Sequence, residues 1–442
     1  MTIEHGENRY NKYGQPTLDL VFTGDKKSLN DRVGNVAVEF TRTQDTQASY
    51  YKSDGTIGYA STDVARFDHD PMTGECRGLL IEESRTNSIT YSFDLGNTGT
   101  GGWYTNANKG GLNGSSTKNY FVTQSNTTDT LAPDGTYTAT KLSAPGTIID
   151  PTATPGINPS SKPIHLVSKV TAPDGVSSFY IKDPSNFANG LDKIGIMSGG
   201  LFNPAKGLAS FDLVNNQVNT ANTASDARIE DVGNGWYRIS CVTGEGGSWA
   251  FNAWNALTSD LYIWGAQCES GGSFPTSYIP TSDATATRGS DQALLNGTDV
   301  TSWYNITEGT VYSEAMSPLD LNTTRLVWHF RDPGRKEHNA VTGFQWYDVG
   351  TGYSTNGITY VAGVFNKQAY AYSHITGSST RACLNGEFRY DLPVNPSATP
   401  SAHTTLSLGS NVGTNIFLNG YIKQFTYWST RLSDSDIQGL TE

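Results

Sequence analysis

Short apolar and aromatic runs separated by turn-forming clusters repeat along this chain, and they limit the folds open to it. Residues 17–22 and 36–40 alternate apolar and polar side chains, as half-buried strands do. Asn234-Gly235 predicts a hairpin turn, and residues 236–241 after it predict the next strand. The 442 residues include 47 glycines and 11% aromatic residues but only 16% charged residues. We therefore predict an all-β protein.

The net charge of −12 excludes some classes of partner. An acidic chain is not attracted to phosphate backbones, so we expect no nucleic-acid binding. No apolar run approaches the roughly 20 residues that span a bilayer, so we expect no membrane insertion. Residues 1–7 lack the basic and apolar regions of a secretory signal peptide, which predicts synthesis in the cytoplasm.

The four cysteines give no sign of a metal site, because none forms a CxxC pair and no histidine stands at ligand spacing. They are Cys76, Cys241, Cys268 and Cys383. We predict four reduced and mostly buried thiols. The alternative is a disulfide between Cys241 and Cys268 across neighbouring strands.

The length suggests two or three domains, and turn clusters divide the chain into three regions. Residues 1–88 form a strand-rich lead-in that contains a hairpin at Asp54-Gly55. Residues 89–290 and 291–442 each predict an antiparallel β-sandwich. Ser433, followed three residues later by Asp436, predicts the N-cap of a short helix near the end of the chain.

Two blocks resemble segments that recur in tailed-bacteriophage structural proteins. The first is ARFDHDP at 65–71 with GLLIEESRTN at 78–87, and the second is GGSFPTSYIPT at 271–281 with ATATR at 284–288. In that family the first block precedes a carbohydrate-binding-module-like sandwich and the second closes it. The two blocks stand roughly 180 residues apart, which suits one sandwich with ample loops.

Two further resemblances refine the expected folds. GWYRIS at 235–240 resembles a frequent feature of carbohydrate-binding-module-like jelly rolls. The C-terminal run from 419 to 441 resembles the end of laminin-G-like, concanavalin A-like sandwiches. The resemblance therefore implies a jelly roll at 89–290 and a concanavalin A-like sandwich at 291–442.

The resemblance implies a virion surface protein of the tail-fibre, spike or head-fibre kind. Such a protein attaches to other virion proteins, here through its N-terminal region, and displays its domains to host-surface glycans. Phage fibres generally form homotrimers, so we expect a homotrimer. Two alternatives stay open at this point: a capsid decoration protein that stabilises the shell, and a polysaccharide depolymerase.

Exposed aromatic rings beside amide and carboxylate groups are the residue types that bind sugars, because sugar faces stack on rings and hydroxyls bind the polar groups. The candidate glycan-binding residues are Trp249, Trp254, Trp346, Tyr347 and Asp348. The alternative is that these rings fill a core or a subunit interface. The same two interpretations apply to Trp103 and Tyr104.

Two acidic motifs have structural explanations that we prefer. Asp68-His69-Asp70 stands beside Pro71, so we expect a turn there and not a metal or catalytic site. Glu82 and Glu83 are neighbours, so in a strand they point to opposite faces and cannot flank one glycosidic bond.

We expect Glu82 to form a structural ion pair with Arg66 or Arg85.

The chain contains no P-loop, GxSxG, HExxH or dinucleotide motif, so we predict that it is not an enzyme and needs no cofactor. Related sandwiches often hold a structural calcium, but no ligand for one can be named here.

Overall fold

The structure is a computed structural model. It describes residues 11–43, 48–104, 122–143, 164–182, 194–197, 208–213, 215–221, 223–244, 246–253, 260–317, 325–331, 335–339, 343–348, 351–354, 360–375, 379–393, 402–411 and 416–442.

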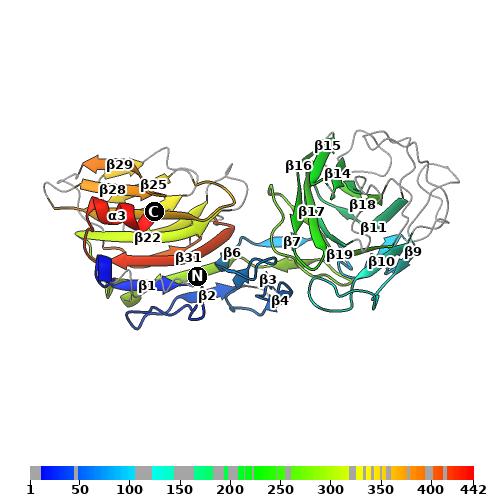
Figure 1. The fold of residues 1–442 in the computed structure, drawn as a ribbon, viewed down its shortest axis with the longest axis horizontal. Coiled ribbons are helices and arrows are strands. Elements are labelled where there is room, and N and C mark those ends of the chain that lie inside the picture. Colours follow the sequence, from blue (N-terminus) through cyan, green and yellow to red (C-terminus); the bar gives the residue numbers. More distant parts are fainter. Residues whose placement is uncertain are drawn as a thin grey trace.

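Antiparallel strands make up most of the regular structure in these residues and form two lobes, each with two packed sheets (Figure 1). The helices α2 (Thr298–Thr301) and α3 (Asp434–Thr441) are short. In the described ranges, no helix has the length and apolar character that a membrane crossing needs. The predicted all-β fold with two antiparallel sandwiches is confirmed.

The C-terminal lobe has a first sheet in the order β29-β28-β27-β22-β31-β6-β5, and β1 also pairs with β31. Its strands are β1 (Leu18–Val21), β5 (Phe67–His69), β6 (Cys76–Ile81), β22 (Glu308–Met316), β27 (Asn366–Ser373), β28 (Ser379–Leu384), β29 (Glu387–Pro393) and β31 (Gly420–Trp428). One edge of β31 pairs with β22 and the other with β1 and β6, so β31 is the centre of the sheet.

The second sheet of this lobe has the order β2-β21-β30-β23-β24-β25-β26. Its strands are β2 (Glu39–Arg42), β21 (Asp291–Asn296), β23 (Leu326–Arg331), β24 (Arg335–Asn339), β25 (Gly343–Asp348), β26 (Thr351–Ser354) and β30 (Thr405–Leu408). Leu20 and Phe425 of the first sheet pack with Phe40 and Trp328 of the second to form the core. The N-terminal strands β1, β2, β5 and β6 thus complete the two sheets of the C-terminal lobe. The division of the sequence into three regions does not predict this pairing.

The predicted helix cap near the C-terminus is confirmed. Helix α3 begins after Ser433, whose Oγ accepts a hydrogen bond from the backbone N–H of Asp436 at 3.2 Å. Ile437 and Leu440 bury the apolar face of the helix with Tyr312 and Trp428 of the first sheet.

The middle lobe has a first sheet in the order β16-β17-β12-β19-β10-β9, with β7 pairing both β19 and β20. Its strands are β7 (Arg85–Asn87), β9 (Val122–Gln124), β10 (Thr140–Ser143), β12 (Gly175–Lys182), β16 (Ala224–Asp231), β17 (Trp236–Thr243), β19 (Leu261–Ser270) and β20 (Ala286–Arg288). The facing sheet has the order β15-β14-β13-β18-β11-β8. Its strands are β8 (Trp103–Tyr104), β11 (Ile164–Ala172), β13 (Ile194–Met197), β14 (Leu208–Asp212), β15 (Gln217–Ala221) and β18 (Gly247–Ala253).

Strand β19 is buried on both faces, since nine of its ten residues are buried in a row. Leu261 and Ile263 face the core between the sheets of the middle lobe. Tyr262 and Trp264 belong instead to an aromatic cluster on the outer face of the sheet. The hairpin of β3 (Ala48–Tyr51) and β4 (Ile57–Ala60), which the sequence predicts at Asp54-Gly55, helps to cover this cluster.

The four cysteines are free thiols, as the first interpretation predicts. The alternative disulfide is wrong for a geometric reason. Cys241 on β17 and Cys268 on β19 both stand opposite Ser177, so strand β12 lies between them. Two strand spacings of about 4.8 Å separate their Cα atoms by more than a disulfide can span.

Five buried charged side chains join the chain segments that pass between the lobes. Asp291 accepts from Arg42 at 3.1 Å and from Arg66 at 2.5 Å, and the side chains of all three are fully buried. Glu82 pairs with Arg66 at 2.8 Å and with Arg288 at 3.1 Å. We call these five residues the ionic junction; it confirms the predicted pair between Glu82 and Arg66, whereas Arg85 pairs with Glu83.

The ionic junction also brings together the two phage-like sequence blocks. Glu82 of the first block accepts hydrogen bonds from the N–H and the Oγ of Ser277 of the second, at 2.8 and 2.6 Å. Arg288 of the second block donates to the carbonyl oxygen of Glu83 at 2.6 Å. Residues far apart in the sequence therefore form one structural element.

We predict that Arg66→Met strongly destabilises the protein, because it leaves Glu82 and Asp291 buried with fewer cationic partners. The expected loss in the free energy of unfolding is about 3–5 kcal/mol, measured by urea denaturation. Lys52→Met is the matched control, since the ion pair of Lys52 with Asp54 is exposed and its loss costs about 0–1 kcal/mol. Equal effects of the two substitutions would contradict this role for the junction.

We predict acid sensitivity from Glu82. Burial raises the pKa of this carboxyl group, but Arg288, Arg66 and hydrogen bonds from Ser277 outweigh burial and lower the pKa to about 2 from an ordinary 4.5. The stabilisation is present above pH 4.5 and is lost as the pH falls toward 2, with a total of roughly 3 kcal/mol. Chemical denaturation between pH 5 and 2 measures it; Glu82→Gln is expected to be less stable at pH 6 and to show a shallower decline.

Candidate functional site

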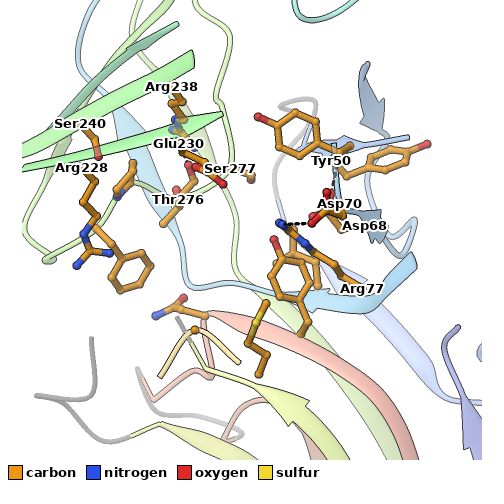
Figure 2. Close-up of a pocket in the computed structure, with 18 of the residues that line it drawn as sticks. Tyr50, Asp68, Asp70, Arg77, Arg228, Glu230, Arg238, Ser240, Thr276 and Ser277 are labelled. Carbon is orange, nitrogen blue, oxygen red and sulfur yellow. Dashed lines mark hydrogen bonds and ion pairs between the residues drawn. The ribbon is translucent and has the colours of Figure 1, made fainter. Parts of the chain in front are cut away.

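A cleft of about 770 Å³ opens between the two lobes, next to the ionic junction. Its walls come from the hairpin β16–β17 of the middle lobe, from the segment that contains β3, β5 and β6, and from β31 and residues 363–365 of the C-terminal lobe. Figure 2 shows Arg228, Glu230, Arg238 and Ser240 on one side of the cleft and Tyr50, Asp68, Asp70 and Arg77 on another.

The middle-lobe wall follows from strand register. Arg228 stands opposite Ser240 and Glu230 opposite Arg238, so alternate residues of both strands share the face that lines the cleft. Arg238 is buried, and its Nη2 donates to the Oγ of Ser178 at 3.2 Å and to the carbonyl oxygen of Thr276 at 2.8 Å. Arg228 is half-buried and Glu230 is exposed, so both remain accessible from the cleft.

The opposite wall presents acidic groups held by a turn. Asp70 pairs with Arg77 at 2.9 Å and accepts from the N–H groups of Met72 and Thr73 at 2.9 and 3.0 Å. Asp70 therefore acts as the expected turn residue. Asp68 and His69 differ from the expectation, because they lie in strand β5. In the described ranges no group of His, Cys, Asp and Glu side chains could hold a metal ion.

Asp68 is an acid of the cleft whose pKa is raised by burial. Its side chain is 2% exposed, and its Oδ1 accepts from the N–H of Tyr51 at 2.5 Å. Burial raises the pKa of Asp68 to about 6, although the Tyr51 N–H, the Tyr421 hydroxyl and Arg77 act in the opposite direction. This carboxyl group therefore exchanges its proton near pH 6.

Aromatic side chains line the cleft, and the half-buried ones offer flat apolar surfaces to it. The half-buried rings are Tyr50, Tyr51, Phe365 and Tyr421, whereas Phe274, Tyr180 and Tyr278 are buried in the wall. The ring of Tyr50 packs over Gly58, where an added Cβ would lie 3.2 Å from the Tyr50 Cζ atom. The guanidinium of Arg77 lies 5.7 Å from the centroid of the Tyr421 ring, and the ammonium of Lys423 lies 4.0 Å from that of Phe365.

The strands that carry four of the glycan-binding residues predicted from the sequence are β18 and β25. The backbone of Trp249 belongs to β18 of the middle lobe, and Trp346, Tyr347 and Asp348 belong to β25 of the C-terminal lobe. Trp254 lies outside the described residues. The two strands that carry the other four residues belong to different lobes. Their role in sugar binding stays a prediction.

Trp103 belongs to the core of the middle lobe. Its side chain is fully buried, with a ring centroid 6.3 Å from that of Phe179. Its indole Nε1 donates to the carbonyl oxygen of Tyr91 at 3.2 Å. This tryptophan fills the sandwich interior and has no surface to offer a sugar.

Comparison with known proteins gives structural neighbours only. No family model matches the chain, and no curated protein matches it. One similar solved structure is the CBM40 of Ruminococcus gnavus IT-sialidase bound to α2,3-sialyllactose, at 11% identity over 34% of this chain and 93% of that one, with a TM-score of 0.30.

Two further solved structures resemble this chain to a similar extent. Domain 4 of a GH43 extracellular arabinanase from Geobacillus stearothermophilus, in complex with arabinotriose, matches at 14% identity over 39% of this chain and 82% of that one, with a TM-score of 0.29. The receptor binding domain of botulinum neurotoxin D matches at 14% identity over 34% of this chain and 40% of that one, with a TM-score of 0.26.

We predict that Asp68 makes stability depend on pH between about 4 and 6. Its pKa is higher in the folded chain than in the unfolded chain, so the folded state binds the proton more tightly and loses stability as the pH rises through this range. Asp68→Asn removes this contribution. From pH 4 to pH 7 the unchanged chain is expected to lose roughly 3 kcal/mol of unfolding free energy relative to Asp68→Asn. A constant difference in denaturation experiments would contradict the assignment.

Proposed function

We propose that this protein is a bacteriophage virion surface protein that binds host-surface glycans in the cleft between its lobes. The observation that carries the proposal is the composition of the cleft, which is lined both by tyrosine and phenylalanine rings and by carboxylate, guanidinium, hydroxyl and amide groups. The resemblance of residues 65–87 and 271–288 to phage structural proteins supports the virion assignment.

The cleft has the size and the chemistry that a short glycan needs. Its volume of about 770 Å³ lies in the range of small-molecule sites. The apolar face of a sugar ring packs on aromatic side chains such as Tyr50, while hydroxyl groups bind to charged groups such as Glu230 and Arg238. The ionic junction holds the walls in place before a ligand binds, which reduces the entropic cost of binding.

The proposed mechanism is reversible adhesion without cleavage, and it needs no cofactor. A single glycan site binds weakly, and display of several copies increases the overall avidity. A homotrimer attached to other virion proteins would present three clefts to the host surface. Size-exclusion chromatography with light scattering tests the trimer.

We predict that Tyr50→Ala weakens glycan binding by roughly tenfold, since it removes one aromatic face. Stacking of a planar nucleic-acid base on such a ring is worth about 1–3 kcal/mol, and we expect the low end of that range for a sugar face. A glycan array followed by calorimetry on the full chain measures the change. Tyr137→Ala is the matched control, because Tyr137 is 53% exposed and does not line the cleft. A larger loss in Trp249→Ala than in Tyr50→Ala would place the site on β18 instead.

Counting the protein on intact virions by immunogold labelling tests its place in the particle. A few copies at the tail support a host-recognition fibre or spike. Hundreds of copies on the head favour a decoration protein that stabilises the shell and would make adhesion secondary. Release of reducing ends from host polysaccharide would show a depolymerase and contradict simple adhesion.

A further inference from the structure

Two neighbouring residues of the cleft, Asn419 and Ser317, carry buried hydrogen-bond donors without a partner in the described structure. Asn419 is 4% exposed, and its Oδ1 accepts from the N–H of Glu83 at 2.7 Å while its Nδ2 donates to nothing. The Oγ of Ser317 is also unpartnered, and this residue is fully buried. Both residues line the cleft. Buried donors without an acceptor are costly, so they indicate a place where a ligand atom accepts.

The backbone holds these two donors next to each other. Met316 pairs with Tyr421, so Ser317 and Gly420 follow at the same end of β22 and β31. A Cβ on Gly420 would lie 2.1 Å from the carbonyl oxygen of Met316 and 3.3 Å from the Cα of Ser317. Only glycine permits this approach. Asn419 has a φ of 49°, a left-handed conformation that asparagine tolerates.

Arg228 adds a positive charge that no described carboxylate neutralises by contact. Arg77 is paired with Asp70, and Lys423 lies within ion-pair distance of Glu75 and Glu314. Among the described residues, no ion pair or hydrogen bond involves the Arg228 guanidinium. Figure 2 shows this side chain extending from its strand into the cleft.

We propose that Arg228, Asn419 and Ser317 form a subsite for the carboxylate of an acidic sugar, so that the cleft selects glycans that carry uronic- or sialic-type acids. A carboxylate offers several acceptor sites and a charge, which matches one guanidinium, one amide N–H and one hydroxyl. The exposed carboxylate of Glu230 remains for the sugar hydroxyls. This inference rests on the proposed glycan-binding function and adds the ligand class.

Calorimetry on the full chain tests the subsite with a panel of carboxylate-bearing oligosaccharides, including trigalacturonate and 3′-sialyllactose, each compared with its methyl ester. The ester keeps the sugar shape and removes the charge. We expect at least one acid to bind about tenfold or more tightly than its ester, because charged hydrogen bonds are the stronger ones. We also expect the preference to decline as salt increases.

Arg228→Gln is expected to reduce the ratio of acid to ester affinity to about one while changing the ester affinity less than threefold. Arg32→Gln is the matched control, since Arg32 is exposed and lies outside the cleft. Thermal unfolding checks that both variants fold. Asn419→Asp is a second variant. It keeps an oxygen that accepts from the N–H of Glu83, and it replaces the unpartnered amide donor with a second acceptor. We expect it to weaken binding of the acid at least as much as Arg228→Gln does.

Equal binding of acid and ester by the unchanged chain, or an acid preference that survives in Arg228→Gln, would overturn the subsite while glycan binding itself stands. Absence of binding by every acidic and neutral glycan would refute the proposed function as well. The two failures are therefore distinguishable in one experiment.

Discussion

The buried ionic junction is the constraint on which the arrangement of both lobes depends. Moving three arginines and two carboxylates out of water is expensive unless every charge has partners, and the junction supplies them from segments that lie far apart in the sequence. The chain enters the middle lobe through β7 and leaves it through β20, and these two strands pair with each other. Glu82 directly precedes β7, and Arg288 lies on β20, so their ion pair joins the segment that enters the middle lobe to the segment that leaves it.

The cleft is a consequence of that junction. Glu82 and Ser277, which hydrogen-bond in the junction, also line the cleft. The aromatic cluster on the outer face of β19 adds a second fixed contact, with the rings of Trp264 and Tyr278 4.5 Å apart between their centroids. Part of the cleft wall is thus formed by groups that take part in these buried contacts. Arg228 and Glu230 take no part in them and remain available to a ligand.

Local signals in the sequence predicted much of the structure. Alternating residues and Asn-Gly or Asp-Gly turns located the hairpins at 54–55 and 234–235, and Ser433 marked the final helix. The pair of Arg66 and Glu82 was also predicted, because both belong to one short block. The cleft was not predicted, since its residues come from separate segments that only long-range pairing brings together. Register could have indicated one wall, because hairpin alternation places Arg228, Glu230, Arg238 and Ser240 on one face.

The pairing of β1 with β31 has a consequence for the order in which the chain becomes structured during synthesis. Thr17 and Tyr427 hydrogen-bond across 410 positions, so the first strands leave the ribosome long before their partner exists. The middle lobe can complete its own sheets while β1, β2, β5 and β6 still lack their partner strands from the C-terminal region. Unpaired strand edges promote association with other chains, and slow closure of distant contacts lengthens that exposure. The edges of the N-terminal strands are therefore exposed to association with other chains until β31 has been synthesised.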